Sequence, residues 1–282
     1  MPDFSQVLLT VDFDRTLTAP DSSIPQRNIE AIEYFIANGG TFTVNTGRSV
    51  SSFQKYLETL PRNAPLLLYN GSATYDKGKV QDCAVFDLSP ETVLSDMRRL
   101  FPDMNLEVQG ARVHHLVDPT PEFLDFYDAL GWPYEIWQSG TDLQPFIKFA
   151  LYGKPSQSAI SDMFRATPQE EQRFLDAARQ ISQLYAGKVE VFLAAPRIID
   201  VHAKGVSKCA SARALQKKLG KKILVCVGDA QNDVAMLDGA DYAYCPADSI
   251  VAGQYETVCS CGDGAVADVI YKKIPAICEI QP

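Results

Sequence analysis

The sequence lacks several features that would assign the protein to other classes. It has no run of about 18 apolar residues, so we expect no membrane-spanning helix and no membrane partner. It opens with no basic segment followed by an apolar one, so we expect no signal peptide. Lys and Arg form no long run and the formal net charge is −9, which argues against a nucleic-acid partner because an acidic protein repels the phosphate backbone.

Cysteine is present without a disulfide or zinc pattern. The chain has seven cysteines, an odd number, and only Cys259 and Cys261 lie close together. A single C-x-C pair with no second pair nearby is weak evidence for zinc. We therefore expect reduced cysteines in a cytoplasmic protein. The length of 282 residues and the apolar content of 46% fit one large or two ordinary globular domains.

Strand-like and helix-like segments alternate at both ends of the chain. In the N-terminal part we expect strands at 7–11, 41–45 and 66–69, with helices at 25–38 and 51–60. In the C-terminal part we expect strands at 198–201, 223–227 and 241–244, with helices at 206–219, from Asn232 onward, and at 264–273. This alternation is typical of a parallel sheet covered by helices.

The middle of the chain lacks that alternation. A hairpin is expected at 74–86. Beyond it we expect helices at 90–100, 121–130, 156–164 and 168–185 and strands at 106–108, 112–116, 146–151 and 189–192. The predicted fold is therefore α/β: a Rossmann-like parallel-sheet core, residues 1–85 and 195–282, with an inserted α+β domain, residues 86–194.

Polar clusters follow three of the predicted core strands. The carboxyl ends of parallel strands share one edge of a sheet, where ligands bind, so clusters far apart in sequence can share a pocket. The clusters are Asp12-Phe13-Asp14-Arg15-Thr16, Thr46-Gly47-Arg48 and Gly228-Asp229-Ala230-Gln231-Asn232-Asp233.

Four carboxylates at that edge point to a hard cation. Asp12 and Asp14 are two residues apart, so in an extended segment they face the same way. Like charges so close resist joint ionisation unless a cation joins them. With Asp229 and Asp233 the set is all oxygen, which suits Mg²⁺. The Asp-x-Asp pair taken alone could equally be a loop or a helix cap.

Other polar residues have both functional and ordinary interpretations. Thr46 and Gly47 could hold a phosphate oxygen at a helix start or form an ordinary N-cap. Lys208, in the first turn of a helix, opposes the helix dipole, which hints at pairing with the carboxylates and a phosphate, although a lone Lys is usually a surface group. His114 and His115 point to opposite faces of a strand, so a shared metal is not expected.

The order of these motifs resembles the haloacid-dehalogenase-like (HAD) phosphatase superfamily, and more narrowly its Cof-type subgroup. The motifs are Asp-x-Asp-x-Thr, a Ser/Thr, a Lys and Gly-Asp-x-x-Asn-Asp. The Cof-type subgroup has similar short motifs at the positions of Thr46-Gly47-Arg48-Ser49, Asn70-Gly71, Gly205-Val206-Ser207-Lys208, Met236 and Asp263-Gly264. The insertion matches the subgroup's large α/β cap by size and position.

The resemblance implies a role for each matching residue. Asp12 would be the nucleophile and a Mg²⁺ ligand, and Asp14 the general acid/base whose backbone carbonyl also binds the metal. Asp229 would be a metal ligand, supported by Asp233. The phosphoryl group would be held by Thr46, Gly47, Lys208 and Asn232. Two departures stand out: Arg15 where these proteins usually have Gly, and Pro246-Ala247 where Asn-Ala is usual.

The resemblance implies a Mg²⁺-dependent phosphatase that hydrolyses a phosphorylated small metabolite, such as a sugar phosphate, through an aspartyl-phosphate. A phosphomutase with the same core and a non-catalytic protein that binds a phosphorylated ligand are the alternatives. The substrate, and a monomer or a homodimer as the oligomeric state, stay open.

Overall fold

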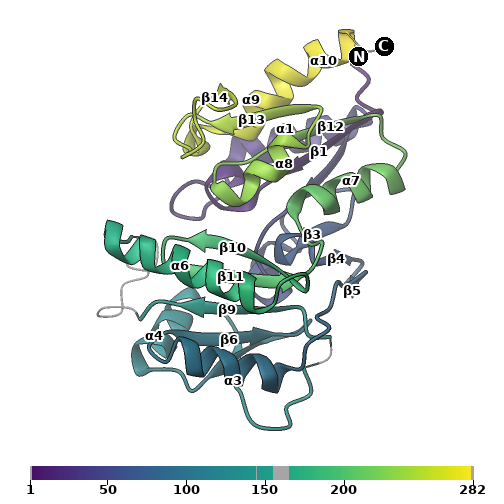
Figure 1. Ribbon diagram of the computed structural model, residues 1–282. Coiled ribbons are helices and arrows are strands. Elements are labelled where there is room, and N and C mark those ends of the chain that lie inside the picture. Colours follow the sequence, from purple (N-terminus) through teal and green to yellow (C-terminus); the bar gives the residue numbers. More distant parts are fainter. Residues whose placement is uncertain (1, 144, 155–164, 281–282) are drawn as a thin grey trace. The chain divides into compact units, whose positions relative to one another are not determined.

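The computed structural model describes residues 2–143, 145–154 and 165–280 (Figure 1). Contacts divide the chain into two compact units. The first, called here the core unit, consists of Met1–Gly47, Lys55–Gln81 and Ser207–Pro282, and the second, the inserted unit, of Arg48–Gln54 and Asp82–Val206.

A five-stranded parallel sheet forms the centre of the core unit. Its order is β14-β13-β12-β1-β2, and all four pairings are parallel. The two central strands are buried along their whole length, as expected for apolar strands with helices on both faces. The strands are β1 (Val7–Val11), β2 (Thr41–Val44), β12 (Ile223–Val227), β13 (Tyr242–Pro246) and β14 (Glu256–Val258).

A small antiparallel sheet continues the edge of this unit. It has the order β3-β4-β5, and β3 meets the end of β2 through a bridge between Asn45 and Leu67. Lys77 and Gly78 turn the hairpin with positive φ angles. The strands are β3 (Leu66–Leu68), β4 (Ala73–Asp76) and β5 (Lys79–Gln81).

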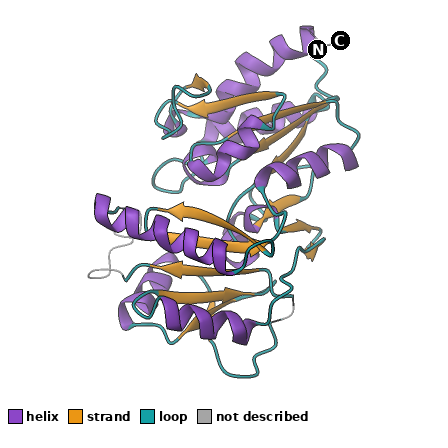
Figure 2. Ribbon diagram, viewed as in Figure 1, coloured by secondary structure: helices purple, strands orange, loops and turns teal. Residues whose placement is uncertain are grey.

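Helices cover the parallel sheet because their apolar residues pack onto it (Figure 2). Leu215 and Met236, for example, join Leu8 and Leu224 of the central strands in one apolar cluster. The helices of the core unit are α1 (Gln26–Ala37), α7 (Lys208–Lys218), α8 (Val234–Asp238), α9 (Ala265–Asp268) and α10 (Ile274–Ile280).

The inserted unit is a six-stranded sheet with helices on both faces. Its order is β10-β11-β9-β6-β7-β8, and only β7 and β8 pair in parallel. Residues of α3 and α6 share one apolar cluster with one face, and residues of α4 share another with the other face. The strands are β6 (Asn105–Gln109), β7 (His114–Val117), β8 (Tyr134–Ile136), β9 (Lys148–Tyr152), β10 (Val189–Ala195) and β11 (Ile198–Ala203). The helices are α2 (Val50–Phe53), α3 (Pro90–Leu100), α4 (Pro121–Leu130) and α6 (Pro168–Leu184).

The predicted fold class is confirmed, and several details of the elements differ from the expectation. The segment expected as a core strand at 198–201 is β11 of the other sheet, because a strand buried on both faces has the same pattern in either sheet. The helix expected at 51–60 shortens to α2 and a 3₁₀ turn at Gln54–Tyr56, since Ser side chains there bond to the backbone. Strands β8 and β14 were not expected, and the helix expected at 156–164 lies outside the described residues.

No described helix combines the length and the apolar character needed to span a bilayer.

Candidate active site

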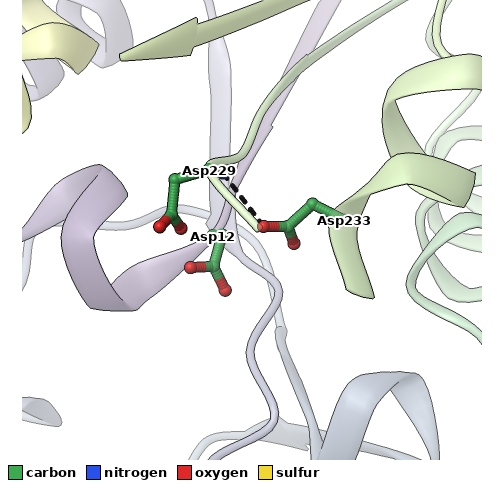
Figure 3. Close-up of side chains that lie close together, drawn as sticks. All are labelled: Asp12, Asp229 and Asp233. Atoms are coloured by element: carbon green, nitrogen blue, oxygen red, sulfur yellow. Dashed lines mark hydrogen bonds between the residues drawn. The ribbon is translucent and has the colours of Figure 1, made fainter. Parts of the chain in front are cut away.

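The first and third polar clusters meet because β1 and β12 are neighbours. Asp12 directly follows β1, and its backbone N–H donates to the carbonyl of Val227, the last residue of β12, at 2.8 Å. Asp229 comes two residues after that end. One carboxylate oxygen from each of Asp12, Asp229 and Asp233 lies within 4.8 Å of the corresponding oxygens of the other two residues. All three residues are buried (Figure 3).

Backbone N–H groups fix the Asp233 carboxylate. Its Oδ2 accepts from the N–H of Asp229 at 3.0 Å and of Ala230 at 3.1 Å. Gly228 leaves the necessary space, because a Cβ at that position would lie 2.6 Å from the Cβ of Asp233. Thr16 completes the frame, since its hydroxyl donates to Oδ1 of Asp229 at 3.0 Å.

Lys208 lies between two of these carboxylates. Its Nζ is 2.5 Å from Oδ1 of Asp12 and 2.6 Å from Oδ1 of Asp233, and its side chain is 2% exposed. The lysine is the first residue of α7, whose N-cap is Ser207. The Asn45 side chain at the end of β2 donates to the Lys208 carbonyl at 2.8 Å. The pairing of Lys208 with carboxylates, which its unfavourable position in the first turn of a helix suggested, is therefore present.

The carboxylates carry more negative charge than one lysine can balance. Burial raises the pKa of Asp12 well above its usual range, against the pull of Lys208, and the charges of Asp233 and Asp229 raise it further. Burial and Asp233 raise the pKa of Asp229 to about 7. The two carboxylates beside Lys208 raise its pKa although burial opposes this, so the ammonium stays charged.

These residues fit a divalent cation. Their donors are all carboxylate oxygens, which Mg²⁺ prefers, and a bound cation would relieve the repulsion that raises the pKa of Asp12 and Asp229. The described group of close carboxylates contains Asp12, Asp229 and Asp233 but not the Asp14 side chain. The suggestion that Asp14 binds the metal concerned its backbone carbonyl.

Asp14 and Arg15 follow Asp12 in a five-residue π-helical turn with irregular geometry. Asp14 is extended and half-buried, and its charge contributes to the raised pKa of Asp12. Arg15 has a φ of 58°, which explains why glycine suits this position, since only glycine adopts positive φ without a steric cost. Although burial opposes it, hydrogen bonds from Cys261 lower the pKa of Asp248, and the charge of the exposed Arg15 side chain makes a smaller contribution in the same direction.

Thr46, Gly47 and Asn232 lie where the topology brings them to the same sheet edge. The N–H of Asn45 donates to the carbonyl of Val11 at 2.8 Å, so Asn45 follows β2 as Asp12 follows β1, and Thr46 is the next residue. Thr46 is buried, whereas Asn232, next to Asp233, is half-buried. Thr46 and Gly47 do not start the helix as expected, because α2 begins at Val50 with Ser49 as its N-cap.

Sequence reasoning missed two groups of polar residues. Asn45 supports Lys208, and its only signal is a polar residue closing an apolar strand. Glu107 and His114 are buried and bonded to each other, and their diagonal positions on the neighbouring strands β6 and β7 are not visible without the register of the two strands.

Comparisons with known proteins place this geometry in context. A sequence model of haloacid dehalogenase-like hydrolases matches residues 9–251. HMP-PP phosphatase of Serratia proteamaculans is 25% identical over 235 residues, which are 82% of this chain and 80% of that protein. A solved structure from Streptococcus mutans UA159 covers 93% of this chain and 97% of its own, with a TM-score of 0.78 and 18% identity. A HAD subclass IIB sugar phosphatase covers 93% and 97%, with a TM-score of 0.70 and 19% identity.

Proposed function

Because this chain belongs to the haloacid dehalogenase-like hydrolase family and is a phosphatase, we propose that it hydrolyses a phosphorylated small molecule with Asp12 as nucleophile and Mg²⁺ as cofactor. The observation that carries the proposal is the group of three buried carboxylates around the Lys208 ammonium. A buried excess of negative charge is costly to fold, and a site for a cation and a phosphate explains why it is kept.

In the first half-reaction, an oxygen of Asp12 attacks phosphorus in line with the leaving oxygen. A bond forms between that oxygen and phosphorus, and the ester P–O bond breaks. Asp14 donates a proton to the leaving oxygen, so the product departs as an alcohol. Lys208 supplies positive charge to the phosphoryl oxygens, and Thr46, Gly47 and Asn232 orient them.

In the second half-reaction, water hydrolyses the aspartyl-phosphate. Asp14, now ionised, takes a proton from the water, whose oxygen forms the new bond to phosphorus while the bond to Asp12 breaks. Inorganic phosphate leaves and both carboxyl groups return to their starting states. Asp12, Asp229 and the backbone carbonyl of Asp14 would hold Mg²⁺, with Asp233 in support, and the bound ion would neutralise charge on the phosphoryl oxygens.

The inserted unit is proposed as a cap that recognises the leaving group. Two similar proteins, named HMP-PP phosphatase and sugar phosphatase, suggest HMP-PP and sugar phosphates as the first substrates to test. A phosphomutase would use the same aspartyl-phosphate but return the phosphoryl group to the substrate.

The test is phosphate release from a panel of phosphorylated metabolites, with Mg²⁺ and with a chelator. The Asp12→Asn variant should lose turnover, whereas Asp21→Asn, at an exposed loop carboxylate, should keep it. Wild-type-like turnover by Asp12→Asn, or by the chelated enzyme, would refute the proposal. A positional isomer of the substrate in place of free phosphate would identify a mutase.

A further inference from the structure

A buried carboxylate organises the polar part of the inserted sheet. Glu107 of β6 is fully buried. Its Oε1 bonds to His114 Nδ1 of β7 and accepts from the Gln109 amide at 2.5 Å, and its Oε2 accepts from the Tyr152 hydroxyl at 2.7 Å. Three polar partners from neighbouring strand positions therefore satisfy one carboxylate, which fixes its orientation.

The other nitrogen of His114 contacts the segment that follows the Thr46-Gly47 turn. His114 Nε2 lies 2.7 Å from Oγ of Ser49. Ser49 is the N-cap of α2, and its hydroxyl accepts from the N–H of Ser52 at 3.0 Å. The imidazole is stacked on Trp132, with ring centroids 5.7 Å apart. Ring packing and the carboxylate together hold His114 in one orientation.

The charge of Glu107 determines where the protons lie in the hydrogen-bonded series Ser49–His114–Glu107. Burial alone would raise the pKa of Glu107, but His114, Lys148 and the hydrogen bonds lower it to about 2. The carboxylate is ionised and can only accept, so His114 Nδ1 carries a proton. In the neutral ring Nε2 then accepts from the Ser49 hydroxyl, and in the charged ring it donates to the same oxygen. The contact therefore persists in both states of the imidazole.

A Ser–His–Glu chain has the order of a nucleophile, a base and an orienting acid. Ser49 does not fit the first role, because it is 3% exposed and its oxygen already caps α2. The position of Ser49 in the sequence fits a structural role instead. Arg48–Gln54 groups with the inserted unit, whereas the preceding Thr46 and Gly47 belong to the core unit, so Ser49 lies directly beyond the turn proposed to bind phosphate.

We propose that His114, oriented by Glu107, is a positioning residue that fixes Ser49 and thereby the Thr46-Gly47-Arg48 turn on which the substrate phosphate binds. Arg48 belongs to the same arrangement, since its guanidinium donates to the Ser52 carbonyl at 3.1 Å. The inference rests on the proposed function for the identity of the anion. It adds a residue of the inserted unit, which belongs to none of the catalytic motifs in the sequence, to the determinants of phosphate affinity.

The experiment measures binding of inorganic phosphate by calorimetry in the presence of Mg²⁺, together with KM and kcat. The variants are His114→Gln, Ser49→Ala and their combination. His115→Gln is the matched control, because His115 is the next residue of β7, points to the opposite face and lies 3.4 Å from the exposed Glu135 carboxylate. Thermal unfolding shows which variants are folded. Ser49→Ala, which leaves the buried Glu107–His114 pair intact, decides the matter should His114→Gln not fold.

Each single variant should weaken phosphate binding and raise KM by about 3- to 10-fold, the effect of one neutral hydrogen bond, with kcat changed much less. The double variant should be no worse than either single variant, because both remove the same contact. Affinities of His114→Gln equal to those of His115→Gln, additive losses, or a wild type that binds no phosphate would overturn the inference. A wild type that binds phosphate but releases none from any substrate would refute the proposed function alone.

Discussion

The sharpest steric test of the site is Gly228→Ala. An added Cβ would lie 2.6 Å from Cβ, 2.7 Å from Cγ and 2.9 Å from Oδ2 of Asp233. Ordinary contacts of this kind begin near 3.4 Å, so the Asp233 side chain or its backbone must move by close to an ångström. Three hydrogen bonds depend on its present place: those from the N–H groups of Asp229 and Ala230 and that from Lys208.

The expected loss follows from that displacement. Overpacking a rigid interior costs about 1–3 kcal/mol of unfolding free energy, which lowers the melting temperature by a few degrees in a chain of this size. A misplacement of about 1 Å in a catalytic group costs turnover roughly 10²-fold. Gly228→Ala should therefore stay folded and lose most of its activity.

The assay is turnover of p-nitrophenyl phosphate with saturating Mg²⁺, beside thermal unfolding of the same samples. The control is Gly262→Ala, where no atom lies within 4 Å of an added Cβ and φ is not positive. Wild-type kcat in Gly228→Ala would refute the reasoning, because it would mean that the position of Asp233 does not matter for turnover.

Three further predictions concern the charges. In the metal-free protein the pKa of Asp229 is about 7, against 3.8 for an ordinary Asp, so the folded state keeps a proton that the unfolded state releases. The free energy of unfolding should therefore fall as the pH rises from about 4 to about 7, and Mg²⁺ should raise the melting temperature more at pH 8 than at pH 5; equal shifts in calorimetry would contradict this. Lys208→Met should lower kcat by about 10²- to 10³-fold, whereas Lys204→Met, at an exposed lysine, should not, and steady-state kinetics compares the two. The pKa of Glu107 is about 2 against 4.5, so it stabilises the fold above pH 4.5 and loses this as the pH falls toward 2. Over this pH range the free energy of unfolding of Glu107→Gln should therefore fall by about 3 kcal/mol less than that of the wild type. An unchanged pH dependence in urea unfolding would refute the lowered pKa of Glu107.

Local signals predicted much of the secondary structure. Helices α3 and α4 have the expected bounds, since each begins with proline at its first position and follows Ser89 or Thr120 as N-cap. Gly131, in the left-handed conformation, then ends α4. These signals lie within a few residues of the boundary that they set, so no tertiary information was needed.

Pairing between distant strands was harder to predict. The apolar segment at β11 fits any strand with two buried faces, and only its antiparallel partners β9 and β10 place it in the second sheet. For the same reason the sequence did not reveal the Glu107–His114 pair, which depends on the register of β6 and β7. Asp12 and Asp229 could be brought together from sequence because any parallel sheet places the carboxyl ends of its strands at one edge. The catalytic roles of the site residues remain predictions.

The position of β1 between β2 and β12 has a consequence for synthesis on the ribosome. β1 is made first, yet its partner β12 follows about 200 residues later, which takes roughly 10–40 s at 5–20 residues per second. Until then β1, which is buried along its whole length in the finished fold, and Asp12 beside it have one completed neighbour, β2, on one side only. Residues 82–206 are complete before β12 is made, so the inserted unit can fold while the core unit waits. Chaperone dependence and truncation-induced aggregation should therefore be governed by the time needed to reach residue 227, the last of β12.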